Sequence, residues 1–236
     1  MHQRNTAANG KISNYLSQTY LYPKNFDELL YCSQLLQADA IRYGVEHFRR
    51  FRGTCMGTVV WQLNDIWPVA SWASVDYYGN WKALQYAEKR MFAPILLSCA
   101  EHGEIDQKPY VNTLPRPVDL SADLHVANET AEPVTGSVKW ALRLPDSSVV
   151  QEGLFTVTAP AFGGAWLPHL DFTGQDPLKV HLEYALYIED TLVSSGSTLF
   201  CAPKHYAFLD PQLQVSVEND VVTVTAANTC FQVFLM

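Results

Sequence analysis

The residues with the clearest chemistry lie between Trp61 and Trp81, a stretch that holds four of the chain's six tryptophans. Amide and acid side chains stand among these indoles, at Gln62, Asn64 and Asp65. The apolar face of a pyranose packs on an aromatic ring, and its hydroxyls need hydrogen-bond partners. The cluster therefore suits a sugar. The alternative is that these tryptophans are packing residues with satisfied N–H groups.

The surrounding residues predict one strand–loop–helix unit. Val59 and Val60 are β-branched and belong to a short apolar run that is typical of a strand buried on both faces. The polar loop that follows contains Pro68, and Asn80 then offers an N-cap to a helix over residues 81–90. In a barrel of such units, catalytic groups lie on the loops that follow the strands.

The chain resembles the β-mannosidases of glycoside hydrolase family 2. The resemblance is strong over about residues 1–95 and extends to the remainder only as an order of domains. The residues that carry it are His2-Gln3-Arg4-Asn5, Gly10-Lys11-Ile12, Tyr31, Ser33-Gln34, Gln37-Ala38, Glu46-His47-Phe48-Arg49-Arg50, Trp61-Gln62-Leu63-Asn64-Asp65, Trp67-Pro68, Ser71-Trp72, Asp76-Tyr77, Gly79 and Trp81-Lys82-Ala83.

This resemblance implies a substrate-binding role for four residues of the loop. Trp61, at the end of the eighth strand of a (β/α)8 barrel, would form the platform under the sugar that is cleaved. Asn64, Asp65 and Trp67 would line or brace the same rim. Asp65 could hold a substrate hydroxyl, or it could hydrogen-bond the loop backbone as an Asx turn, which we prefer slightly.

Retaining glycoside hydrolysis uses two carboxyl groups about 5 Å apart. The resemblance implies that both are glutamates upstream of Met1, so we expect no catalytic residue in this chain and no activity from it alone. Asp65 and Asp76 are the only acids in the loop. An inverting pair made from them, with carboxyls roughly 6.5–9.5 Å apart, is the alternative, but it explains less than the resemblance does.

Helical periodicity predicts one long helix over residues 25–50, with Asn25 as its cap and Glu28 three residues later. We interpret it as an outer barrel helix, and Glu46-His47 as a surface pair on it. Residues 1–23 are polar and are expected to be irregular. Residues 1–95 are thus interpreted as the last part of a barrel.

Alternating patterns after Pro94 predict an immunoglobulin-like β-sandwich over residues 96–203. Its expected strands begin near Ile95 and lie around 120–126, 138–144, 155–157, 180–186 and 192–200. Turn signals include Gly163-Gly164, and Pro109, Pro115 and Pro117 mark a linker. Trp140 alternates with core residues, whereas the position of Trp166 is less certain.

Residues 204–236 predict three more strands, around 215–217, 221–225 and 230–235. They would begin a further, truncated β-domain or add to the sandwich. The predicted fold class is therefore an α+β multidomain chain: βα units of a (β/α)8 TIM barrel, an immunoglobulin-like sandwich and part of another β-domain.

Composition excludes several other classes of protein. The formal charge of −8 and the lack of a basic run argue against nucleic-acid binding, and no apolar run reaches the length of a membrane span. Five separated cysteines predict reduced, mostly buried thiols in a cytoplasmic protein. The seven histidines form no metal motif, and His169 and His205 are expected on loops, so we expect no metal and no cofactor. Asn128-Glu129-Thr130 matches a glycosylation sequon.

Two hypotheses of function follow. The first is the C-terminal portion of a retaining, β-mannosidase-like hydrolase that acts on terminal β-mannosyl residues of an oligosaccharide when complete, or a family 2 hydrolase with another glycoside specificity. The second is a non-catalytic carbohydrate-binding or interaction module. The expected partners are the sugar and the missing N-terminal region, with which the chain would pair, or a second copy through self-association.

Overall fold

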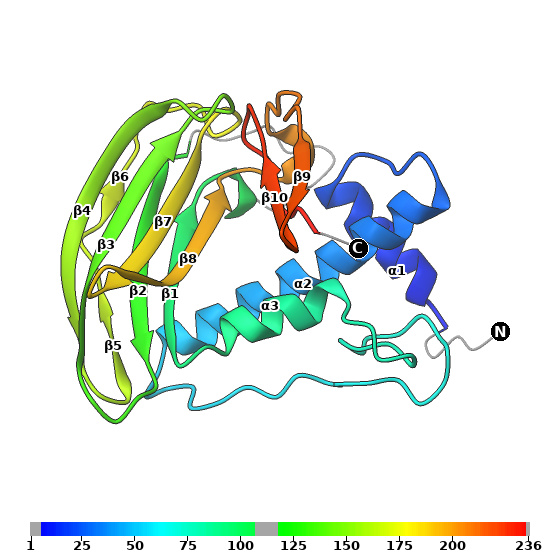
Figure 1. Cartoon of the computed structure of the whole chain (residues 1–236), viewed down its shortest axis with the longest axis horizontal. Coiled ribbons are helices and arrows are strands. Elements are labelled where there is room, and N and C mark those ends of the chain that lie inside the picture. The colour runs from blue at the N-terminus through cyan, green and yellow to red at the C-terminus, as the bar shows by residue number, and fades with distance from the viewer. Residues whose placement is uncertain (1–5, 107–117, 235–236) are drawn as a thin grey trace.

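A computed structural model describes residues 6–106 and 118–234. Figure 1 shows a β-sandwich on the left, a helical part on the right, and a small hairpin above the helices. The helices are α1 (Ala8–Thr19), α2 (Phe26–Arg50) and α3 (Ala83–Met91). The expectation that residues 1–23 are irregular is therefore wrong over α1, whose polar sequence and lack of a side-chain cap gave no helical signal.

Helix α2 begins as the sequence predicts. The side-chain oxygen of Asn25 accepts a hydrogen bond from the Glu28 backbone N–H at 2.8 Å, and the Glu28 carboxylate accepts one from the Lys24 backbone N–H at 2.8 Å. This arrangement supplies acceptors to two backbone donors at the helix start. The long helix over residues 25–50 is confirmed to within one residue.

The strand predicted at Val59 and Val60 is wrong. Residues 55–60 form no regular structure, and the Val59 side chain is 93% exposed. The extended segment runs below α2 in Figure 1 and has no neighbouring strand within the described ranges. An isolated strand leaves its backbone groups unpaired, so β-branched residues alone do not produce one.

Helix α3 begins two residues later than predicted, after Lys82 and without a side-chain cap. Asn80 was the predicted cap, but its amide nitrogen donates to the Asp76 carboxylate at 2.9 Å instead. The packing of α2 against α3 forms the core of the helical part, around Leu35, Val45 and Leu84.

The sandwich consists of two antiparallel sheets. One contains β1 (Ile95–His102), β2 (Ser121–Asn128) and β5 (Gly163–Trp166) in that order, with β6 (Leu170–Asp171) also on β2. The other has the order β4-β3-β7-β8, with bounds Val149–Ala159, Val134–Arg143, His181–Ile188 and Thr191–Leu199. Short 3-10 helices cover Glu104–Asp106 and Pro203–His205. The six expected strand positions all fall on or overlap observed strands.

Alternating side chains from both sheets form the sandwich core. Val138, Trp140 and Leu142 of β3 point inward, as do Leu182 and Leu186 of β7. Trp140 is a core residue, as its alternation predicted. Trp166 is half exposed and packs edge-on against His125, with ring centroids 4.7 Å apart.

The turn predicted at Gly163-Gly164 ends at Gly163, whose backbone N–H donates to the Pro160 oxygen at 3.2 Å, and the two glycines then begin strand β5. Gly164 also has a steric role. A Cβ atom at Gly164 would lie 2.5 Å from the buried His125 imidazole, so only glycine lets β5 approach β2 at this point. Gly164 therefore marks a close contact between strands.

Strands β9 (Gln214–Glu218) and β10 (Val221–Thr225) confirm two of the three strands expected after residue 204. They pair with each other as a separate two-stranded sheet, so the alternative in which they extend the sandwich is wrong for the part of the chain that is described. Residues 230–234 form no strand. Gln232 and Phe234 contact α2 and α3, whereas the Phe231 ring packs edge-on against His181 of β7. The Tyr31 hydroxyl donates to the Gln232 backbone oxygen at 2.7 Å.

Cationic side chains at the end of α2 hold this helix to the end of α3 and to the sandwich. Arg49 donates to the backbone oxygens of Met91 and Ala93 at 2.6 and 2.8 Å, and Arg50 donates to the backbone oxygen of Cys99 at 3.0 Å. Glu46 is buried at this junction and pairs with Arg42 at 3.1 Å. The prediction of a surface position is therefore wrong for Glu46.

The structure also tests the predictions for the cysteines, the glycosylation sequon and membrane-spanning segments. All five cysteines are free thiols, but only Cys99 and Cys201 are fully buried. The Asn128 side chain of the sequon is buried and donates to the backbone oxygen of Glu132 at 2.8 Å. Pro109, Pro115 and Pro117 lie outside the described residues. No helix within those residues is long and apolar enough to cross a membrane.

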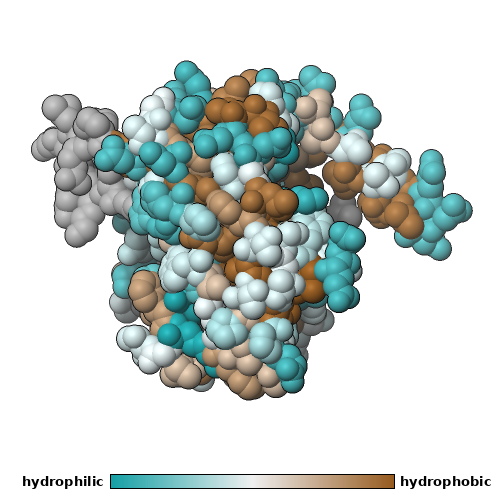
Figure 2. All heavy atoms as spheres, turned by 90° about the vertical axis from the view of Figure 1, so that its left-hand side faces the viewer, coloured by the Kyte–Doolittle hydropathy of each residue, from teal (hydrophilic) through white to brown (hydrophobic). Residues whose placement is uncertain are grey.

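The surface on the sandwich side carries both apolar and polar side chains. Figure 2 looks onto the side that lies on the left in Figure 1, where β4 forms a sheet edge, and shows apolar and polar side chains next to one another. Such a mixture is ordinary, because apolar atoms contribute much of the surface of a folded protein.

Candidate functional site

We call residues 61–82 the aromatic loop. It has no regular secondary structure, but backbone hydrogen bonds hold its two sides together. The Val75 N–H donates to the Leu63 oxygen at 2.7 Å, and the Lys82 N–H donates to the Ser74 oxygen at 2.9 Å. The peptide bond between Trp61 and Gln62 is cis. The loop is thus a folded unit at the start of α3.

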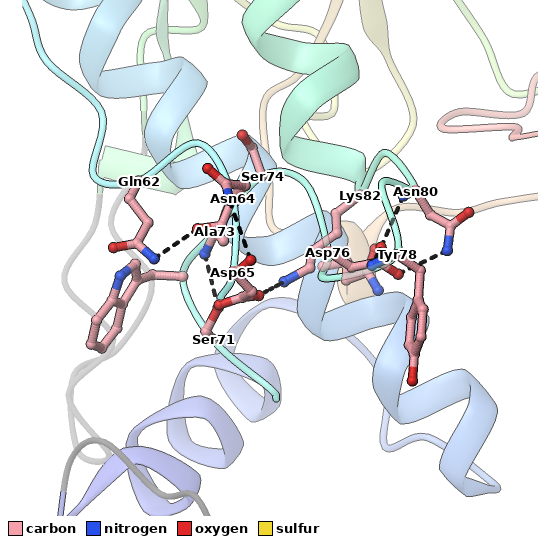
Figure 3. A network of polar contacts seen from close by, with 12 residues as sticks. Gln62, Asn64, Asp65, Ser71, Ala73, Ser74, Asp76, Tyr78, Asn80 and Lys82 are labelled. Atoms are coloured by element: carbon pink, nitrogen blue, oxygen red, sulfur yellow. Dashed lines mark hydrogen bonds and ion pairs between the residues drawn. The ribbon is translucent and has the colours of Figure 1, made fainter. Parts of the chain in front are cut away.

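Asp65 lies at the centre of the loop and is only 4% exposed. Figure 3 shows its carboxylate between Ser71 and Lys82. One carboxylate oxygen accepts from the Ser71 hydroxyl at 2.6 Å, and the other pairs with the Lys82 ammonium at 3.2 Å. The Ser71 oxygen in turn accepts from the Ala73 backbone N–H. A buried carboxylate needs such partners, because burial without them is costly.

Asp76 organises the other end of the loop. One of its carboxylate oxygens accepts from the backbone N–H groups of Tyr78 and Asn80, at 2.9 and 2.8 Å, as an Asx turn does (Figure 3). The hydrogen bond from the Asn80 side chain is the main cause that holds the pKa of Asp76 below its usual value. The preferred Asx turn at Asp65 is therefore wrong, and Asp76 makes that turn instead.

These contacts show that both acids of the loop have structural roles. Asp65 is buried and neutralised by Lys82, and Asp76 is held in its ionised form. A general acid needs a raised pKa, which is the opposite of what surrounds Asp76. The geometry therefore does not support an inverting pair made from Asp65 and Asp76.

The aromatic rings of the loop lie at its surface. Trp61 is 72% exposed and Trp81 47%, and Trp67 and Trp72 are also partly exposed. Trp81 packs edge-on against Tyr86 of α3, with ring centroids 5.2 Å apart. The alternative in which the four indoles form a core within this chain does not fit these exposures.

The structure separates the four predicted binding residues into two groups. Trp61, Asn64 and Trp67 are exposed, whereas Asp65 is buried beneath them. The side-chain amide of Asn64 donates to the Asp65 backbone oxygen at 3.2 Å. Asp65 therefore braces the loop, and its side chain has no exposed surface for a substrate hydroxyl.

Sequence reasoning missed Lys82 and Ser71 as the partners of Asp65. Lys82 follows Asp65 by 17 residues and has no periodic relation to it. The only available signal was that an acid within an apolar run needs a cation if it becomes buried. Within residues 6–106 and 118–234, no cluster of three or more metal-binding side chains occurs.

Comparisons with known proteins identify the sandwich. The family described as "Mannosidase Ig/CBM-like domain" matches residues 121–205, which cover β2 to the 3-10 helix after β8. The matched range lies largely within the region predicted to be immunoglobulin-like.

Curated relatives extend the similarity along the chain. The chain is 31% identical over 221 residues to "Beta-mannosidase A" of Aspergillus terreus (strain NIH 2624 / FGSC A1156), which is 85% of this chain and 22% of that relative. It is 42% identical over 80 residues to "Beta-mannosidase" of Capra hircus, which is 31% of this chain and 9% of that relative. The chain thus spans less than a quarter of the length of these relatives.

The fold also has solved counterparts. The structure of Beta-D-Mannosidase from Dictyoglomus thermophilum superposes with a TM-score of 0.74 at 20% identity, and the match covers 94% of this chain and 30% of that one. At this identity the match shows the fold. Taken with the sequence relatives, it leads to the assignment: the chain belongs to the β-mannosidases of glycoside hydrolase family 2 and corresponds to their C-terminal part.

Proposed function

We propose that the aromatic loop forms one wall of the sugar subsite in a retaining β-mannosidase-like hydrolase, which removes terminal β-mannosyl residues when complete. Residues 1–95 would then be the last units of its (β/α)8 barrel, residues 96–203 its immunoglobulin-like domain, and residues 204–236 the start of another β-domain. The catalytic glutamates are not among the acids of this chain, which is inactive alone.

One observation carries this proposal. Trp61 is the most exposed indole of the loop, and a buried Asp65–Lys82 pair fixes the loop from within. An exposed ring on a rigid base can receive the apolar face of a pyranose with little loss of conformational entropy. Asn64 and Trp67, exposed on the same rim, would supply the hydroxyl partner and a second apolar surface.

The test joins the upstream part of the Aspergillus terreus relative to residue 1 and measures hydrolysis of a chromogenic β-mannoside. Replacing Trp61 (Trp61→Ala) removes the platform, so kcat/KM should fall by about tenfold or more. Trp166→Ala removes another half-exposed indole, far along the chain in β5, and is the matched control.

If both variants keep the parent activity, the loop is not a wall of the sugar subsite. If both lose it equally, the effect of Trp61→Ala is a loss of folding and not of binding. A loss that is confined to Trp61→Ala supports the proposal.

A second candidate function is carbohydrate binding without catalysis. The observation that favours it is the match of the sandwich to a family whose description includes "CBM-like". In this alternative the sandwich alone binds sugar, and the joined protein shows no hydrolysis with any variant.

A further inference from the structure

Two glutamines of helix α2 connect this helix to the aromatic loop and its end. The Gln37 side-chain amide donates to the Trp72 backbone oxygen at 2.8 Å, and the Gln34 side-chain oxygen accepts from the Ala83 backbone N–H at 3.4 Å. The two glutamines are three positions apart, so they lie on the same face of the helix. Figure 3 shows α2, in pale blue, passing behind the loop.

The Gln34 contact belongs to the start of α3. This helix begins after Lys82, whose side chain makes no cap hydrogen bond, so its first backbone N–H groups need acceptors from elsewhere. Gln34 supplies an acceptor to the buried Ala83. The contact is therefore explained by the end of a helix.

The Gln37 contact holds the inner side of the loop. Ala73 and Ser74, the two residues after Trp72, have no exposed surface. A backbone carbonyl at the edge of such a buried segment needs a donor, because an unpaired polar group is costly away from water. Gln37 provides this donor from a half-buried position on a regular helix.

Backbone hydrogen bonds continue from this inner side toward Trp61. The Ser74 N–H donates to the Gln62 oxygen at 3.1 Å, and the next residue, Val75, donates to the Leu63 oxygen. Gln62 directly follows Trp61 in the chain. Gln37 is thus linked to the backbone beside Trp61 through one short buried segment and one row of hydrogen bonds.

The Asp65–Lys82 pair has a different effect. It joins Asp65 to Ser71 and Lys82, which all belong to the loop, and so it fixes the shape of the loop. Gln37 belongs to another element and fixes where the loop lies on the molecule. Position matters as much as shape here, because a binding group that is displaced by about 1 Å loses much of its contact with the bound molecule.

We propose that Gln37 is a positioning residue for Trp61: its amide fixes the inner side of the aromatic loop on α2 and so sets where the exposed indole stands. This inference rests on the proposed function, in which Trp61 receives the sugar. In this role Gln37 acts through the loop and does not touch the sugar.

The first test follows the loop in the whole chain, without substrate. Gln37→Met keeps the length and the helix propensity of the side chain but removes the donor. Hydrogen exchange of the Ser74 and Val75 backbone N–H groups should become about fivefold faster or more, because the loop opens more often. Gln18→Met, at an exposed position of α1, is the matched control and should leave this exchange within about twofold.

The second test measures hydrolysis of the chromogenic β-mannoside by the joined protein. Gln37→Met should lower kcat/KM by about fivefold, chiefly through a higher KM, because it weakens the binding of the sugar. Gln37→Lys restores a donor and should return kcat/KM to within about twofold of the parent. In a protein that already carries Trp61→Ala, Gln37→Met should cost less than about twofold, because no platform remains to be positioned.

Parent-like exchange in a folded Gln37→Met protein overturns the proposal. A loss of activity that is equally large with and without the Trp61 indole also overturns it, because an additive loss indicates general destabilisation. Near-UV circular dichroism checks folding, and Gln37→Ala replaces Gln37→Met if that variant does not fold.

The same assay separates this proposal from the proposed function. Parent-like kcat/KM in Gln37→Met, together with a loss in Trp61→Ala, overturns the positioning role alone and leaves the proposed function standing. If Trp61→Ala costs no activity, the proposed function fails, and the positioning role that rests on it fails too. Faster exchange, a higher KM and a loss that disappears in the Trp61→Ala background support Gln37 as the positioning residue.

Discussion

At the scale of single residues, the aromatic loop depends on a buried ion pair. The Asp65 side chain has no exposed surface, and the Lys82 side chain is 13% exposed. A buried charge that loses its partner is strongly destabilising, because the remaining charge stays desolvated. The pair therefore fixes the geometry from which Trp61 and Trp67 extend.

Lys82→Met tests this role. It keeps the length of the side chain but leaves the Asp65 carboxylate unpaired, so the free energy of unfolding should fall by about 3 kcal/mol. Urea unfolding followed by tryptophan fluorescence measures the change. Lys89→Met, on the exposed side of α3, is the control and should cost less than about 0.5 kcal/mol. Equal costs in the two variants would contradict a special role of the pair.

A second residue-scale prediction concerns acid sensitivity at the junction of α2 and the sandwich. Burial, and then the nearby cations Arg50 and Arg49, lower the pKa of His125 from 6.5 to about 4. At pH values between these two pKa values, His125 binds a proton in the unfolded chain but not in the folded chain. This contribution to stability is present above pH 6.5 and is lost as the pH falls toward 4, to a total of about 3 kcal/mol.

His125→Gln removes the titrating group. We expect the free energy of unfolding to fall less steeply between pH 6.5 and 4 than in the parent protein, whatever its absolute value at neutral pH. The exposed His205, changed in the same way, should leave the slope unaltered. An unchanged slope in His125→Gln would show that other groups control the acid response.

At the scale of elements, residues 230–234 connect the end of the described chain to the helical part. The Phe234 ring packs edge-on against Tyr31 of α2 and Tyr86 of α3, with centroids 6.3 and 5.6 Å away. The Gln232 amide also donates to the Asp39 carboxylate at 2.5 Å. This segment therefore stabilises the α2–α3 pair from a distance of about two hundred residues along the chain.

Phe234→Ala should reduce stability by about 1–2 kcal/mol, because it removes a half-buried ring from contact with two others. The urea midpoint of unfolding measures the effect. The neighbouring Val233 is exposed, so Val233→Ala is the matched control. A midpoint that moves no further for Phe234→Ala than for Val233→Ala would mean that the packing contributes nothing.

The elements that the sequence predicted well are those with local signals. Asn25 and Glu28 satisfy the start of α2 within four residues, and alternation marks the strands of the sandwich. The strand at Val59 failed because its stability depends on neighbouring strands, which a residue pattern does not contain. The Asp65–Lys82 pair and the Phe234 contacts were missed for the same reason. Both join residues that only the tertiary fold brings together.

At the scale of the whole molecule, the helical part exposes much apolar surface. Large apolar side chains among residues 1–95 that are more than half exposed include Leu21, Tyr22, Phe26, Met56, Val59, Trp61, Leu63, Ile66 and Tyr78. Its helices also depend on contacts from residues 230–234 and on the sandwich. Surfaces of this kind are partner sites or cause aggregation.

The isolated segment 1–95 should therefore aggregate or fold only with a partner, as size-exclusion chromatography and thermal unfolding would show. Loss of residues 230–234 and of the sandwich removes the partners of Tyr31 and Arg50. A monomeric segment with a sharp, cooperative melt would contradict this prediction.

We proposed above that this chain forms part of a β-mannosidase active site but supplies no catalytic carboxylate. The most direct test is hydrolysis of a chromogenic β-mannoside by the chain alone and by the chain joined to the upstream part of the Aspergillus terreus relative. We predict activity only in the joined protein. Activity of the chain alone would contradict the claim, because Asp65, Asp76 or another acid of this chain would then have to be catalytic.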